Sequence, residues 1–170
     1  CLNTGSTNWI NYYESIGNSD YLTLNLTNSV NTFSNWFYSN ATTFTLNQTF
    51  GNANTSGRTY LAYCFKSTSG FSKIGSYTGN GGSNSITGLG FQPSFIMIKS
   101  QNISGSWFMY DSDRTVSVGD NPGTANARPY ILANTDGKEN GSTSYNIDLD
   151  SDGFSMNLSL IHISEPTRPI

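Results

Sequence analysis

Charge is scarce in this sequence: Lys, Arg, Asp and Glu make up 11% of its 170 residues, against about 25% in an average soluble domain. The formal net charge is −3, so the chain lacks the basic surplus that draws proteins to nucleic acid. Its apolar runs are short, and none approaches the roughly 20 residues of a membrane-spanning helix. We therefore expect neither nucleic-acid binding nor insertion into a membrane.

Histidine is almost absent, since His162 is the only one in the chain. Ser-His-Asp and Cys-His nucleophilic sites need this residue, and many zinc sites use it. His162 also lies within the string LSLIHISEPTR (Leu158–Arg168), which resembles the translation of a sequencing adapter. We expect residues 158–170 to be non-biological, the alternative being a genuine terminal strand. With Cys1 in first place, we also expect the chain to begin inside a longer gene or to have been processed.

Asn, Ser and Thr together make up about 38% of the residues, and aromatics add 14%. The aromatic and β-branched content is too high for a disordered chain. Short runs of these residues alternate with Gly, Asn and Ser clusters, which is the pattern of strands joined by turns. The expected strands are Trp9–Tyr13, Tyr21–Leu26, Thr42–Leu46, Thr59–Lys66, Ser72–Tyr77, Ser94–Lys99, Ser106–Asp111, Tyr130–Ala133, Tyr145–Asp148 and Gly153–Asn157. The fold class is therefore all-β, with antiparallel sheets.

Two halves of the chain resemble each other in sequence. The segment around Trp9 is similar to that around Trp107, and the two positions are 98 residues apart. Tyr21–Thr27 resembles Tyr130–Thr135 at an offset of 109, and Phe44 corresponds to Phe154 at an offset of 110. The order is kept, and an insertion near residues 116–126 accounts for the drift. We predict tandem repeats of about 100 residues.

The repeat hypothesis sets the domain boundaries. Residues 1–70 would be the C-terminal part of a first β repeat, and residues 71–157 most of a second. An alternative is that the two partial copies combine into one permuted sandwich. Residues 158–170 stay outside both.

Four motifs carry a resemblance to a known family. They are SGRTYLAYCF at 56–65, GFSKIGSYTGNG at 70–81, GLGFQPSFIMIK at 88–99, and the stretch from Trp107 to Arg114. Together they resemble a repeated β-rich domain of unknown function in virion and tail-fibre-like proteins of marine tailed phages. The resemblance implies an antiparallel β-sandwich of jelly-roll, concanavalin-like architecture. It also implies a location on the virion surface or outside the cell, beside other virion proteins.

Aromatic side chains are the best candidates for contact with a ligand. Trp36, Phe37 and Tyr38 lie in a loop-like stretch flanked by Asn and Ser, where exposed rings could stack on sugars. Trp9 and Trp107 occupy corresponding positions on expected strands, so we assign both to core packing.

Carboxylates offer two further candidate sites. Asp148, Asp150 and Asp152 match the D-x-D-x-D-G opening of a calcium loop, in which alternating carboxylates converge on one Ca²⁺. The alternative is a polar turn before a strand. Asp111 and Asp113 could face the same side of a strand as a catalytic pair, although Arg114 beside them favours a salt-bridged turn. We expect no cofactor other than Ca²⁺.

The two cysteines, Cys1 and Cys64, are compatible with a disulfide or with two free thiols. Cys64 lies in an apolar stretch, where a lone cysteine usually behaves as a small buried hydrophobe.

These observations predict a non-enzymatic structural or adhesion module, part of a phage tail fibre or appendage. Its partners would be a glycan or protein of the host surface and other virion proteins, and a homo-oligomer such as a trimer is compatible with this role. A carbohydrate-active enzyme of the tailspike type and a secreted cellular adhesin are the alternatives.

Overall fold

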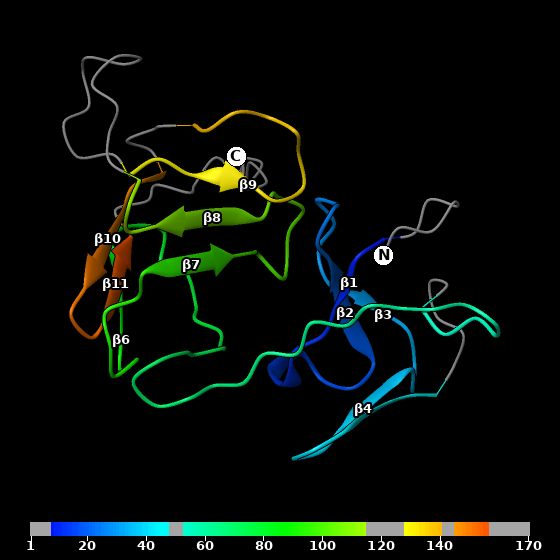
Figure 1. Cartoon of the computed structure of the whole chain (residues 1–170). Coiled ribbons are helices and arrows are strands. Elements are labelled where there is room, and N and C mark those ends of the chain that lie inside the picture. Colours follow the sequence, from blue (N-terminus) through cyan, green and yellow to red (C-terminus); the bar gives the residue numbers. More distant parts are fainter. Residues whose placement is uncertain (1–7, 48–52, 115–127, 141–144, 157–170) are drawn as a thin grey trace, which may run out of the picture. The chain divides into compact units, whose positions relative to one another are not determined.

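A computed structural model describes residues 8–47, 53–114, 128–140 and 145–156 (Figure 1). Helix is scarce: Glu14–Ile16 form one 3₁₀ turn, η1. The strands are β1 (Ile10–Asn11), β2 (Asp20–Thr23), β3 (Asn31–Thr32), β4 (Phe37–Ser39), β5 (Phe44–Leu46), β6 (Asn84–Thr87), β7 (Phe95–Ile98), β8 (Phe108–Asp111), β9 (Ile131–Leu132), β10 (Ile147–Asp150) and β11 (Gly153–Met156). The predicted all-β class is confirmed.

The strands form four small sheets, in the orders β1-β2-β3, β4-β5, β7-β8-β9 and β10-β11-β6. Antiparallel register joins β1 to β2, β2 to β3, β4 to β5, β10 to β11 and β11 to β6. The arrows of β7, β8 and β9 also alternate in direction in Figure 1. Short turns join β4 to β5 and β10 to β11, as antiparallel neighbours allow, whereas β6 and its partner β11 lie far apart in the sequence.

Contacts divide the chain into two compact units, each assembled from separate segments. Unit 1 gathers the described residues of Cys1–Phe65, Ile98–Trp107 and Leu132–Asp136. Unit 2 gathers those of Lys66–Met97, Phe108–Ile131 and Gly137–Ile170. The boundaries 1–70 and 71–157 stay a prediction.

Trp36 is the centre of the core of unit 1, where its side chain is 2% exposed. The rings of Tyr12 and Tyr21 meet its indole edge to face, with centroids 6.2 and 6.0 Å away. This is a favoured geometry for aromatic pairs. The prediction that Trp36 lies on an exposed loop is therefore wrong: β4 begins at the next residue and turns the indole inward.

Unit 2 has a core of tyrosines and aliphatic side chains. Tyr110 and Ile147 are almost fully buried, and Tyr130 lies against Tyr110 at a centroid distance of 5.8 Å. The Tyr110 hydroxyl donates to the carbonyl of Tyr145 at 3.1 Å, which satisfies the polar end of a buried ring. Burial raises the pKa of Tyr110 well above its ordinary value.

An asparagine side chain connects β1 to the end of β2. The backbone N–H of Trp9 donates to Asn25 Oδ1 at 2.9 Å, and Asn25 Nδ2 donates to Asn8 Oδ1 at 3.0 Å. The carbonyl of Trp9 accepts from the N–H of Leu24 at 2.9 Å. We call this set of three bonds the Asn25 clamp.

The same three bonds occur around Asn134, and we call that set the Asn134 clamp. The N–H of Trp107 donates to Asn134 Oδ1 at 2.8 Å, and Asn134 Nδ2 donates to Ser106 Oγ at 3.3 Å. The carbonyl of Trp107 accepts from the N–H of Ala133 at 3.1 Å. Each partner lies 98 or 109 positions after its counterpart, the offsets that the sequence comparison gives.

Strand registers correspond in the same way. Tyr21 pairs with Asn31, and Tyr130 pairs with Asn140, both at an offset of 109. The β4–β5 hairpin and the β10–β11 hairpin share one register, since Phe37 pairs with Leu46 and Ile147 with Met156. Two segments of different sequence thus adopt matching hairpins.

The two hairpins differ in their neighbours. β11 also pairs with β6, and a Cβ on Gly153 would collide with the carbonyl oxygen of Ile86. Thr43 stands at the position that corresponds to Gly153, and no described strand lies beside β5 apart from β4. Glycine is therefore present where a third strand approaches closely.

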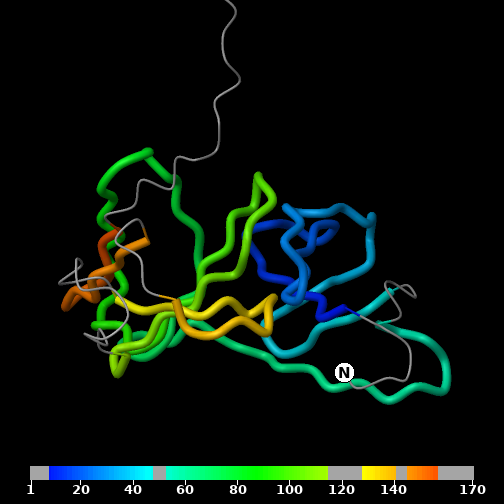
Figure 2. Tube along the Cα trace, turned by 90° about the horizontal axis from the view of Figure 1, so that it is seen from above, coloured from blue at the N-terminus to red at the C-terminus, as the bar shows by residue number. Residues whose placement is uncertain are grey.

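Most expected strands form, with shifted ends, but two do not. Thr59–Lys66 and Ser72–Tyr77 contain no strand, although Ser72 makes an isolated bridge to Thr68. Residues 59–67 follow an extended trace between cyan and green in the tube view (Figure 2). High β propensity alone does not make a strand, because the backbone also needs a partner.

The unbroken apolar run Phe95–Ile98 predicts a strand covered on both faces. That expectation is wrong, because Phe95 and Met97 are 55% and 42% exposed and β7 is covered on one face. The assignment of both tryptophans to the core is wrong for one of them. Trp107 is buried as expected, at 8% exposed, but Trp9 is 37% exposed.

We predict that the Asn134 clamp contributes measurably to stability. Asn134→Ala removes two side-chain hydrogen bonds and should lower the free energy of unfolding by about 1–3 kcal/mol, read from urea denaturation. Asn102, an exposed asparagine, gives the matched control Asn102→Ala, which should change it by less than about 0.5 kcal/mol. Equal losses for the two variants would contradict a clamping role.

Candidate functional site

The β4–β5 hairpin gathers aromatic rings on one side. Phe37 stacks on Phe44 with centroids 5.7 Å apart and an interplanar angle of 10°. The ring of Tyr12 lies 3.8 Å from that of Phe37. We call Tyr12, Phe37 and Phe44 the hairpin aromatic surface. Phe44 is its most exposed member, at 45%. Tyr38 follows Phe37 in β4 and so points to the opposite face of the strand, where it is 38% exposed.

Asparagines fix both ends of β4. Asn35 precedes the strand with φ of +57°, a left-handed conformation that asparagine tolerates better than most residues. Its Oδ1 accepts from the Tyr38 hydroxyl at 3.1 Å. After the strand, Asn40 Oδ1 accepts from the N–H groups of Thr42 and Thr43 at 2.9 and 2.8 Å. The loop therefore holds the ring of Tyr38 by local hydrogen bonds.

The three residues predicted to contact a ligand, Trp36, Phe37 and Tyr38, therefore differ in exposure. Trp36 packs inward, Phe37 is half-buried, and Tyr38 is exposed. Sequence reasoning missed Phe44, which the hairpin register brings beside Phe37. Tyr12, from the residues after β1, also lies against Phe37. Alternation along Thr43–Asn47 was the available signal, since Phe44 stands opposite Ser39 in a two-stranded pairing.

The stretch with Asp148, Asp150 and Asp152 forms the β10–β11 hairpin. Asp152 stands in its turn, and its two carboxylate oxygens accept from the N–H groups of Gly88 and Gly90 at 3.0 and 2.7 Å. Both glycines have φ near +80°, which suits glycine and strains other residues. Asp152 thereby anchors the loop that follows β6.

Asp148 and Asp150 lie on β10 itself. Among the described residues, no group of three or more His, Cys, Asp or Glu side chains is placed to hold a metal ion. A cation at Asp152 would have to compete with two backbone amides for the same oxygens.

Asp111 and Asp113 do not converge as a pair. Arg114 Nε donates to Asp111 at 2.5 Å, and its Nη1 donates to Glu139 at 2.6 Å. Asp113 instead accepts from the hydroxyl of Ser112 at 3.2 Å. The hydrogen bond from the Arg114 guanidinium lowers the pKa of Asp111. The expectation of a salt-bridged turn beside Arg114 is confirmed.

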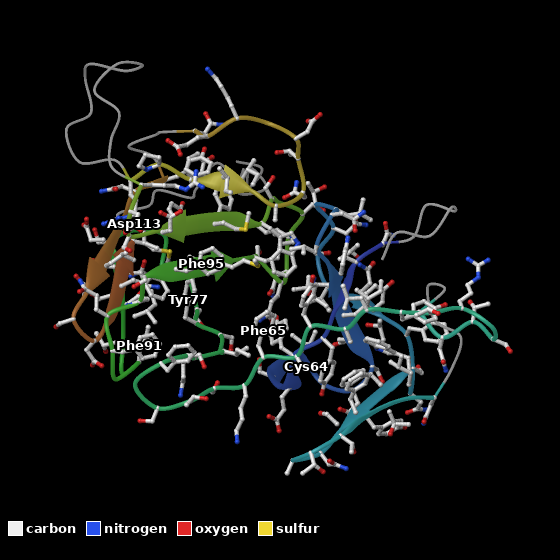
Figure 3. All side chains as sticks on the ribbon, in the orientation of Figure 1. Cys64, Phe65, Tyr77, Phe91, Phe95 and Asp113 are labelled. Carbon is white, nitrogen blue, oxygen red and sulfur yellow. The ribbon has the colours of Figure 1, made fainter. Side chains whose placement is uncertain are left out.

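Cys64 is an exposed free thiol, so the expectation that it is buried is wrong. Cys1 lies outside the described residues. Figure 3 shows Cys64 beside Phe65 on the extended segment. The large apolar side chains exposed in and after this segment are Tyr60, Leu61, Tyr63, Phe65, Phe71, Ile74 and Tyr77.

In the described part of the chain, no helix has the length and apolar character to cross a membrane. Comparison with known families finds a match to a domain of unknown function over residues 2–165. The chain belongs to the DUF7483 family. No curated protein and no solved structure matches it. The DUF7483 match ends within residues 158–170, a segment that lies outside the described residues.

We predict that Asp152 stabilises the DUF7483 chain without a metal. Asp152→Ala should lower the free energy of unfolding by about 1–2 kcal/mol, because two amides lose a charged acceptor. The loss should be equal in EDTA and in Ca²⁺. Asp150→Ala is the control and should cost less. A loss seen only with Ca²⁺ would instead indicate a calcium site.

The Asp111–Arg114 pair gives a pH dependence. Because the folded-state pKa of Asp111 lies below its ordinary value of 3.8, its contribution is present above that value and disappears as the pH falls through the folded-state pKa. Arg114→Gln should be less stable than the wild type at neutral pH, by a modest amount for a partly exposed pair. The difference should shrink below about pH 4. A constant difference down to the acid transition would refute this assignment.

Proposed function

We propose that this chain is a non-enzymatic structural and adhesion module, built from two partial copies of one β repeat. The observation that carries the proposal is the recurrence of the Asn25 clamp as the Asn134 clamp. Chance similarity of Asn-rich strands would not reproduce three hydrogen bonds between corresponding atoms. Repeated modules of this kind suit extended surface proteins.

We place the module in a virion appendage such as a phage tail fibre, with a jelly-roll, lectin-like arrangement of strands. Support for this comes from the motifs at 70–81 and 88–99 and from the small antiparallel sheets. Low charge and abundant Asn, Ser and Thr fit a surface that faces solvent and other proteins.

The hairpin aromatic surface is our candidate for contact with the host. Phe44 presents an exposed ring opposite the neutral Ser39. On the other face of β4, Tyr38 offers a second exposed ring, and its hydroxyl is oriented by Asn35. Rings with one apolar face and one polar tip bind well at wet interfaces. A neutral glycan matches this chemistry better than a charged polymer.

The arrangement of carboxylates favours adhesion over glycoside hydrolysis. Hydrolases of that class need two carboxyl groups facing one substrate bond. Here Asp111 and Glu139 share Arg114, and Asp152 holds two amides. These groups are engaged in the structure of the loops.

We predict that glycan retention depends on Phe44. On an array of immobilised neutral oligosaccharides, Phe44→Ala should reduce binding at least tenfold for the glycans that retain the wild type. Phe71→Ala removes another exposed ring and should leave binding unchanged. Binding lost equally in both variants, or no retention of any glycan, would contradict the assigned surface, and release of shortened oligosaccharides would favour the enzyme.

A further inference from the structure

The turn after β2 makes a set of polar contacts with the segment after β7. The indole Nε1 of Trp107 donates to the carbonyl of Thr23 at 2.9 Å. The carbonyl of Thr27 accepts from the N–H of Gly105 at 2.7 Å and from Lys99 Nζ at 3.1 Å. The N–H of Val30 donates to the Gln101 carbonyl at 2.8 Å. We call this the turn–tryptophan contact; all of its residues lie in unit 1.

In the proposed repeat, the turn–tryptophan contact joins one copy to the next. The acceptors of Trp107, Gly105 and Lys99, which are the carbonyls of Thr23 and Thr27, precede residue 71, whereas the three donors belong to the later copy. By the offsets above, Thr23 corresponds to Leu132, Thr27 to Asp136, and Trp107 to Trp9. The chain therefore carries a second tryptophan and a second acceptor turn.

Neither of these second elements makes the contact within the described part of the chain. Trp9 has the same backbone hydrogen bonds as Trp107, yet it is 37% exposed against 8%. One neighbour of its indole is Tyr63, stacked at a centroid distance of 6.2 Å. The chain thus presents an unused donor at Trp9.

The acceptor turn has the same internal geometry as the first. The carbonyl of Leu132 accepts from the N–H of Thr135 at 3.4 Å, as that of Thr23 does from Leu26 at 3.3 Å. Thr23 is 3% exposed and receives the Trp107 indole in addition. Leu132 is half-buried and Asp136 is exposed. The Leu132 carbonyl keeps a second lone pair available for a donor.

We propose that the chain associates head to tail, with Trp9 of one molecule on the Leu132–Asp136 turn of a second copy. The partner is a copy of this chain because the turn–tryptophan contact already shows the same elements joined. The inference rests on the repeat in the proposed function. Such an interface uses different surfaces on its two sides, so it joins more than two copies, in a ring or in an open series.

Two complementary variants test the arrangement by sedimentation equilibrium of the full chain. The average mass of the wild type should rise with concentration beyond that of a dimer. Trp9→Ala removes the donor, and Asp136→Trp obstructs the acceptor turn. Each alone should weaken association at least about thirtyfold. Their equimolar mixture should form dimers and stop there, because each molecule retains one functional surface.

Two further variants separate this interface from other causes of association. Trp9→Phe keeps a ring for Tyr63 but has no indole N–H, so it should associate more weakly than the wild type. Phe71→Ala, an exposed aromatic at 80%, should associate like the wild type. Circular dichroism of each variant establishes that it is folded.

A wild type that stays monomeric up to high micromolar concentration would overturn the proposal. So would association that survives in Trp9→Ala, or a mixture of Trp9→Ala and Asp136→Trp that stays monomeric. Glycan retention depends on Phe44 and is measured separately, so the failure of one proposal is distinguishable from the failure of the other.

Discussion

One asparagine side chain bridges two stretches of backbone in each half of this protein. Its amide oxygen accepts a hydrogen bond from the backbone N–H of a tryptophan. Its amide nitrogen donates to the side chain of the residue that precedes this tryptophan. Strands of two to four residues supply few ladder hydrogen bonds of their own. Side-chain bonds of this kind therefore decide where strands as short as β1 and β9 can form. The abundant Asn, Ser and Thr residues supply side-chain hydrogen bonds of this kind.

The sequence predicted strands well where the local alternation of apolar and polar residues coincides with pairing to a neighbouring strand. Leu22 and Leu24 alternate with polar residues, and β2 forms there, although it ends at Thr23. The predicted correspondence of Trp9 with Trp107 agrees with their backbone hydrogen bonds, which are alike. The β4–β5 and β10–β11 hairpins also share a register, which similarity of sequence does not indicate.

Other features depended on contacts that no local pattern encodes. Trp36 looked like a loop residue because Asn and Ser surround it, yet two tyrosines from distant positions enclose it. The aspartates of 148–152 matched a calcium loop by spacing. The backbone amides that engage Asp152 lie more than sixty residues earlier. The sequence around Trp36 does not reveal these tyrosines, and the sequence around Asp152 does not reveal these amides.

The extended segment of residues 59–67 marks the limit of propensity as a guide. Its aromatic and apolar side chains favour a strand, and Phe65 is nevertheless 80% exposed. A run of this composition that forms no strand is prone to pair with another chain. Self-association through this segment would differ from the proposed head-to-tail contact, since it would not require Trp9.

The central claim is that one hydrogen-bonded module occurs twice in this chain. Amide hydrogen exchange, measured residue by residue by NMR, tests it most directly. Slow exchange is expected at four amides, those of Trp9, Leu24, Trp107 and Ala133. Slow exchange at Trp107 and Ala133 with fast exchange at both Trp9 and Leu24, or the reverse, would contradict the claim.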